Sequence, residues 1–346
     1  MSRDQSSLLG SLVKGVAQVT IGMMVCEAGL RWWEKLKASN QYHFWRYYYS
    51  KETLEQADQL MYPTTLRSTG ITLHMDIFQQ NKKNAPVVIL NHGAAGYGRL
   101  MLPLALRLYE RGYTVVVPDR KGQGFSGGTR GDYTVKESTA NIVDVIRWAH
   151  VAFNGPIYLA GGSLGGALSY YAASETSQVK AVACLNLFDF SFNTDGIRFT
   201  GFDQYIDSHK LGIALEIDST LSQPWQWSRI PFNWILPFDK MMQEEDGHFM
   251  DYWYSDPLRN RLVSLRCLYS FLNSPPPIPF ELNELPVMVL NQEYDQLADP
   301  DITRSNYERL EGPKSYESIP FGHWSSTDKF WDLIAEKSDA WFSKHK

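Results

Sequence analysis

The chain is poor in cysteine, in clustered positive charge and in long apolar runs. Its cysteines, Cys26, Cys184 and Cys267, are odd in number and lack metal-type spacing. This excludes a disulfide framework and a zinc site and favours a reducing compartment. Lys and Arg total 33 against 38 Asp and Glu, and the basic residues are scattered, so nucleic acid is excluded as a partner.

The N-terminal region contains the apolar run "GVAQVTIGMMVC", which is about a dozen residues long. A membrane-spanning helix needs about 20 residues, so this run is too short to cross. The charge-neutral start "MSRDQSS" and the lack of an A-x-A cleavage site argue against a signal peptide. These features together predict a cytoplasmic protein.

The run continues into "LRWWEKLKASNQYHFWRYYY", which mixes aromatic and basic residues. Two interpretations stay open for this helical arm, residues 1–60. It lies in a membrane interface as an amphipathic helix, giving peripheral membrane contact, or it packs on the protein's own surface or on a second subunit.

From residue 64 onward the pattern becomes regular. "TTLRSTGITLHMDIFQQ" alternates apolar and polar residues around Thr69-Gly70 and predicts a β-hairpin. Short apolar runs such as "APVVILN", "TVVVPD", "PIYLAG" and "VKAVACLNL" then alternate with segments of helical spacing. Strands that alternate with helices predict an α/β fold, with a mostly parallel sheet covered on both faces.

Glycines surround one serine in "YLAGGSLGG", directly after a predicted strand and before a predicted helix. Gly161–Gly165 fits the G-x-S-x-G pattern of a nucleophile elbow, a tight turn that exposes Ser163 at a helix N-terminus. The P-loop lysine and the G-x-G-x-x-G spacing of phosphate-binding turns are absent. Ser163 is therefore the predicted nucleophile.

A serine hydroxyl needs a base that is itself oriented by an acid. Chain order favours His323, in the loop "PFGHWSS", as the base, and Asp295, which follows the strand "PVMVLN", as the acid. Asp189 is a second source of the acid. Asp299 and Asp301 are expected to cap the following helix.

The motifs "NHGAAG", "PDRKGQGFSGG", "GGSLGG", "LPVMVLNQEYDQLADP" and "FGHW" occur in this order. Together they resemble the α/β-hydrolase fold family over residues 64–346, and in particular its monoacylglycerol lipase, lysophospholipase and serine aminopeptidase-like branch. The resemblance implies a Ser163, Asp295, His323 triad and an oxyanion hole from the backbone N–H groups of Ala94 and Leu164. It makes His92 a structural loop residue, and the triad chemistry needs no metal or organic cofactor. One departure is Gln292, where the family usually has glycine.

Between residues 187 and 280 the strand–helix rhythm stops and aromatic residues are dense. The resemblance implies an aromatic-rich cap here, inserted between the two parts of the hydrolase core, residues 61–186 and 281–346. The predicted function is hydrolysis of a carboxylic ester, small or lipid-like, through an acyl-enzyme. The same triad also fits an amide, thioester or peptide hydrolase or an acyltransferase, whereas a non-catalytic binding protein would be expected to lack a triad residue.

Overall fold

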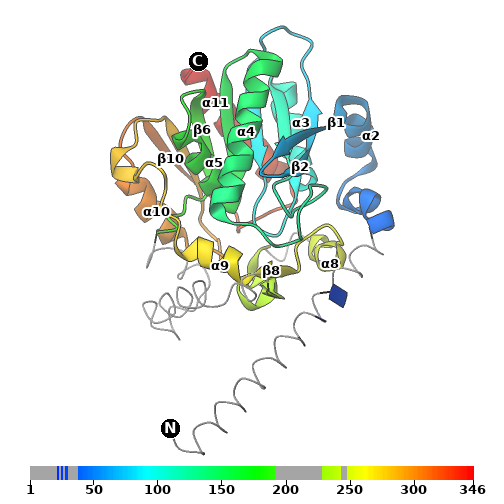
Figure 1. The fold of residues 1–346 in the computed structure, drawn as a ribbon. Coiled ribbons are helices and arrows are strands. Elements are labelled where there is room, and N and C mark those ends of the chain that lie inside the picture. Colours follow the sequence, from blue (N-terminus) through cyan, green and yellow to red (C-terminus); the bar gives the residue numbers. More distant parts are fainter. Residues whose placement is uncertain (1–21, 23–24, 26–27, 30–37, 192–227, 243–247) are drawn as a thin grey trace, which may run out of the picture.

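The computed structural model describes residues 22, 25, 28–29, 38–191, 228–242 and 248–346 (Figure 1). Its centre is an eight-stranded sheet of order β1-β2-β4-β3-β5-β6-β9-β10. The strands are β1 Met61–Ser68, β2 Ile71–Phe78, β3 Val87–Asn91, β4 Thr114–Pro118, β5 Ile157–Gly162, β6 Val179–Leu185, β9 Val287–Gln292 and β10 Lys314–Ile319. From β4 to β10 all neighbouring strands are parallel, while β2 runs antiparallel to both β1 and β4.

The strands follow from the sequence pattern. β3, β4 and β5 are buried at every position, as expected for parallel strands covered on both faces. The β1–β2 hairpin turns at Thr69 and Gly70, which have φ values of 46° and 77°. Positive φ at both central residues is the geometry that tight hairpins prefer.

Helices cover both faces of this sheet (Figure 1). α4 (Val135–Phe153) and α5 (Leu164–Ser174) pack together on one face, and α3 (Leu102–Glu110) and α11 (Asp328–Lys344) pack together on the other. A capping box starts α4, because the Thr134 side chain accepts from the Glu137 N–H and Glu137 accepts from the Thr134 N–H. The remaining core helices are α2 (Lys51–Leu60), η2 (Gly98–Met101), η7 (Phe280–Leu282) and α10 (Pro300–Arg309).

The inserted segment between β6 and β9 forms short elements below the sheet in Figure 1. They are β7 Arg229–Pro231, η4 Phe232–Trp234, η5 Phe238–Lys240, α8 Phe249–Ser255, β8 Leu262–Ser264 and α9 Leu265–Leu272. β7 and β8 pair antiparallel. Much of the predicted cap, residues 192–227 and 243–247, lies outside the described residues.

The end of the predicted N-terminal arm packs on the protein itself. η1 (Ala38–Tyr48) buries Trp45, whose exposed fraction is 2%. The Tyr47 ring stacks on Tyr252 of α8 with 6.0 Å between centroids. Most of the arm before residue 38 lies outside the described residues, and no helix in the described part is long and apolar enough to span a membrane.

Candidate active site

Ser163 lies at the turn between β5 and α5 with φ 54° and ψ −126°. A non-glycine residue rarely adopts this positive φ, so the backbone is strained here. The Ser163 N–H donates to the Leu185 carbonyl at 2.8 Å, which ties the turn to β6. The sequence pattern of the nucleophile elbow therefore corresponds to a strained strand-to-helix turn.

The glycines around Ser163 do not all have the same function. A Cβ on Gly165 would overlap the carbonyl oxygens of Asn91 and His92, and one on Gly166 would lie 2.7 Å from the Asn186 carbonyl oxygen. A Cβ on Gly162 would meet only the Trp324 ring, at an ordinary 3.4 Å. Close backbone approach thus requires glycine after the serine, whereas Gly162 has room for a methyl group.

His323 and Asp295 meet in a buried pair. The His323 Nδ1 lies 2.7 Å from the Asp295 Oδ2, and the two residues are 4% and 6% exposed. The other carboxylate oxygen accepts from the Leu297 and Ala298 N–H groups at 2.9 and 2.8 Å. This carboxylate is therefore held in one orientation, and a proton on Nδ1 leaves the His323 Nε2 as an acceptor.

The other acidic candidates lie elsewhere. Asp189 accepts from the Arg309 guanidinium at 2.9 Å, so its charge pairs with α10. Asp299 is the N-cap residue of α10 and accepts from the Asp301 N–H at 2.9 Å, as expected for a capping residue. Of Asp189, Asp295, Asp299 and Asp301, only Asp295 is hydrogen-bonded to His323.

Strand order explains why residues far apart in sequence converge. Ser163 follows β5, Asp295 follows β9 and His323 follows β10, and these parallel strands end at the same edge of the sheet. Ser163 and His323 line one cavity. From the inserted segment, the lining of this cavity includes Phe238, Met241, Phe249 and Trp253.

Ala94 and Leu164, the predicted oxyanion donors, lie on opposite sides of Ser163 in sequence and adjoin it in space. Leu164 is the first residue of α5, and Ala94 follows Gly93, whose added Cβ would be 3.4 Å from the Ser163 Cβ. Neither the Ala94 nor the Leu164 N–H donates to any group in the described part of the chain. Both amides can therefore donate to a substrate oxygen.

His92 forms loop contacts. Its carbonyl accepts from Arg120 at 2.8 Å, and Arg120 also donates to the Gly93 carbonyl at 3.2 Å. Burial and the positive charge of Arg120 lower the pKa of His92 well below its ordinary value. The His92 ring thus stays neutral at neutral pH, and it lines the same cavity as Ser163.

Gln292 is a site residue whose contact the sequence analysis did not identify. Its buried side-chain amide donates to the His323 backbone carbonyl at 3.2 Å. The only signal was the departure from glycine at this position. The longer side chain connects β9 to the loop that carries the predicted base.

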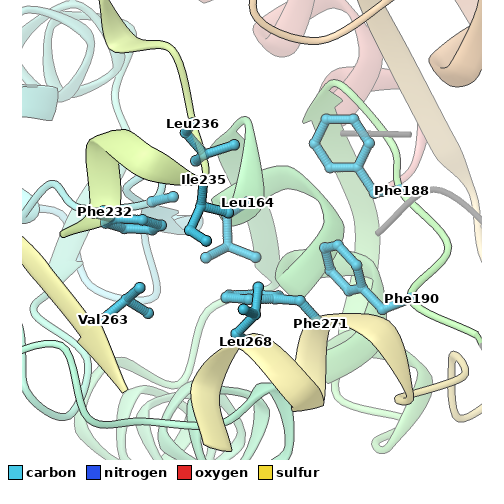
Figure 2. Close-up of a pocket in the computed structure, with 10 residues that line it drawn as sticks. Leu164, Phe188, Phe190, Phe232, Ile235, Leu236, Val263, Leu268 and Phe271 are labelled. Carbon is cyan, nitrogen blue, oxygen red and sulfur yellow. The ribbon is translucent and has the colours of Figure 1, made fainter. Parts of the chain in front are cut away.

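A second cavity adjoins the first and shares Ala94 and Leu236 with it. The described side chains that line the second cavity are all apolar: Ala94, Leu164, Phe188, Phe190, Phe232, Ile235, Leu236, Val263, Leu268 and Phe271. Those labelled in Figure 2 lie around a common space. Among the described residues, no cluster of His, Cys, Asp and Glu is placed to hold a metal ion.

Comparisons with known proteins agree with this architecture. A family model described as "alpha/beta hydrolase fold" matches residues 86–330. No curated protein sequence matches the chain.

Solved structures share the fold at low sequence identity. A monoglyceride lipase from Saccharomyces cerevisiae is 16% identical with a TM-score of 0.64, covering 83% of this chain and 96% of that one. A monoacylglycerol lipase from Paleococcus ferrophilus is 17% identical with a TM-score of 0.60, covering 83% and 99%. The α/β hydrolase GrgF from Penicillium is 17% identical with a TM-score of 0.63, covering 82% and 98%. The family match spans more than two thirds of the chain, and with the sheet order and the strained serine turn it places this protein in the α/β-hydrolase fold family.

Proposed function

We propose that the protein is a serine hydrolase that cleaves a carboxylic ester with an apolar acyl group. The observation that carries the proposal is the buried His323–Asp295 pair at 2.7 Å, whose imidazole lines the same cavity as the strained Ser163. The membership of the hydrolase family and the lipases among the similar structures support it.

In the proposed first step the Ser163 Oγ attacks the ester carbonyl carbon while the His323 Nε2 takes the hydroxyl proton. Asp295 stabilises the imidazolium through the bond to Nδ1. The carbonyl oxygen becomes an oxyanion next to the Ala94 and Leu164 N–H groups. Each such donor is typically worth about 2.7 to 4 kcal/mol in the transition state.

Collapse of the tetrahedral intermediate breaks the bond to the alkoxy oxygen, which receives the proton from His323 and leaves as the alcohol. Water then attacks the acyl-enzyme with His323 again as the base. The carboxylic acid leaves and the Ser163 hydroxyl is restored. Every proton in this cycle passes through His323.

The apolar cavity supports the choice of acyl group. It begins at Ala94 and Leu164, where the oxyanion would lie, and none of the described residues that line it is charged. Each buried methylene of an acyl chain gains about 0.8 kcal/mol there. The preferred ester is therefore expected to carry a medium-length or longer apolar acyl chain.

The test compares the wild type with Ser163→Ala on p-nitrophenyl esters of increasing acyl length, on matched thioesters and amides, and in fluorophosphonate labelling. We expect ester turnover and labelling in the wild type and the loss of both in the variant. Ester turnover that survives in Ser163→Ala overturns the assignment of the nucleophile. Faster cleavage of amides or thioesters than of esters overturns the ester substrate class.

A further inference from the structure

The loop that carries Ala94 contains a strained residue. We call residues 92–98 the oxyanion loop. Ala95, next to Ala94, is fully buried and has φ 57°, a conformation that side chains with a Cβ rarely adopt. Such a conformation persists only where the surroundings hold it.

The inserted segment contacts this loop at two points. The Asn260 N–H donates to the Ala95 carbonyl at 2.8 Å, and the Tyr97 hydroxyl donates to the Asp256 Oδ2 at 2.8 Å. Both partners belong to the stretch that directly follows α8. Residues 256–260 thus hold the part of the oxyanion loop that directly follows Ala94.

Asp256 is fully buried and bonds to a third region of the chain. Its Oδ2 also accepts from the hydroxyl of Tyr48 in η1 at 2.9 Å, and its Oδ1 accepts from the Leu258 N–H at 2.7 Å. Burial raises the pKa of this carboxyl, and the hydrogen bonds act against that rise. The Asp256 Oδ2 therefore links the Tyr48 hydroxyl to the Tyr97 hydroxyl through one shared acceptor.

The segment around Tyr48 also supports the wall of the catalytic cavity. The Tyr48 ring packs on Phe249 of α8 with 4.8 Å between centroids, and Phe249 lines the cavity of Ser163. The neighbouring Tyr49 hydroxyl donates to the Arg99 carbonyl at 2.7 Å, directly after the oxyanion loop.

We propose that Tyr48, Asp256 and Tyr97 act as positioning residues that hold the Ala94 N–H in the oxyanion hole. The N-terminal segment, which precedes the hydrolase core in sequence, thereby helps to set the rate of acyl transfer. This inference rests on the proposed function, because it assigns an oxyanion to Ala94. None of the three side chains touches the reacting atoms.

The test measures how well the hole stabilises oxygen. The kcat and KM values of Tyr48→Phe and Tyr97→Phe are compared with the wild type on a p-nitrophenyl ester and on its thionoester, in which sulfur replaces the carbonyl oxygen. Sulfur is a poor hydrogen-bond acceptor and gains little from amide donors, so the oxygen-to-sulfur ratio of kcat/KM reports on the geometry of the hole. Hydrogen exchange of residues 92–98 is followed in the same proteins.

The control is Tyr113→Phe, which removes a hydroxyl bonded to Asp339 at the same 2.8 Å on the α11 side of the protein. A variant that is merely less stable loses activity on both substrates equally. Loss of one hydrogen bond predicts a fall of about five-fold in kcat on the oxygen ester for each test variant, with little change in KM. The oxygen-to-sulfur ratio falls in parallel, and it is unchanged in Tyr113→Phe.

The possible results distinguish failure of this inference from failure of the proposed function. Faster exchange in the oxyanion loop of both test variants, together with a lower oxygen-to-sulfur ratio, supports the inference. An unchanged ratio in both variants overturns it, and so does exchange that is no faster than in Tyr113→Phe. A wild type that hydrolyses no ester overturns the proposed function and this inference with it, which the wild-type assay alone reveals.

Discussion

Gly165→Ala tests whether close backbone approach shapes the nucleophile turn. Gly165 is the second residue of α5, where alanine is normally favoured over glycine by about 1 kcal/mol. In this protein the added Cβ would lie 2.7 Å from the Asn91 carbonyl carbon and would overlap the carbonyl oxygens of Asn91 and His92. Real Cβ atoms essentially never approach so closely, and the obstacle is backbone that no rotamer change can move.

Overpacking typically costs about 1–3 kcal/mol, and a backbone obstacle belongs at the upper end. After the gain in helix propensity is subtracted, we expect the free energy of unfolding to fall by about 2 kcal/mol. The measurement is urea unfolding followed by tryptophan fluorescence, with the rate of fluorophosphonate labelling as a second readout. Labelling is expected to slow, because relief of the overlap moves Ser163.

Gly162→Ala is the matched control on the other side of the serine. Its Cβ meets only the Trp324 ring, and alanine in a strand is favoured over glycine by about 0.5–1 kcal/mol. This variant should keep or slightly gain stability. The reasoning is refuted if Gly165→Ala unfolds at the same urea concentration as the wild type or a higher one, or if both variants lose stability equally.

Three further predictions concern Gln292, His92 and the apolar cavity. Gln292→Met keeps the volume but removes the donor to the His323 carbonyl, so kcat should fall about five-fold with little change in KM; an unchanged kcat contradicts a positioning role. The lowered pKa of His92 means that below about pH 6.5 the unfolded chain binds a proton that the folded chain does not. The free energy of unfolding therefore carries no penalty from His92 above that pH. Below it, the free energy of unfolding falls by up to about 1.4 kcal/mol for each pH unit, because protonation favours the unfolded chain. Urea unfolding between pH 7.5 and 5.5 should show this slope reduced in His92→Gln, and equal slopes would refute it. Leu268→Trp fills the apolar cavity and should shorten the preferred acyl chain, each excluded methylene costing about 0.8 kcal/mol; an unchanged chain-length profile would show that the acyl group lies elsewhere.

The sheet was predictable where burial is complete. β3, β4 and β5 appear in the sequence as short apolar runs. Their alternation with segments of helical spacing predicts a mostly parallel sheet, and this prediction is confirmed. β10 was missed, because "KSYESI" is mostly exposed or half-buried and shows no apolar run. An edge strand of this kind is defined by pairing with β9, which local sequence does not reveal.

The candidate site was predictable to the extent that its residues belong to local motifs. Ser163 is part of a glycine pattern, and chain order pointed to His323 and Asp295. The hydrogen bond between Asp256 and Tyr48 joins residues 208 positions apart, and neither residue lies in a motif. Contacts of this range arise from the way the inserted segment packs against the loop after β3 and against η1, so the sequence carried no signal for them.

Ser163 and Ala95, two strained residues of the site, have a common physical basis. Ser163 and Ala95 have φ values of 54° and 57°, and each conformation of this kind costs on the order of 1–3 kcal/mol. They belong to loops that leave β5 and β3, which are adjacent strands with Asn91 paired to Gly161. Because the strand register fixes the distance between the two loops, the proposed oxyanion hole would require both strained turns to direct the Leu164 and Ala94 amides toward one point. Relief of the strain at either position would separate the amides, so the strained backbone is expected to be a requirement of the proposed chemistry.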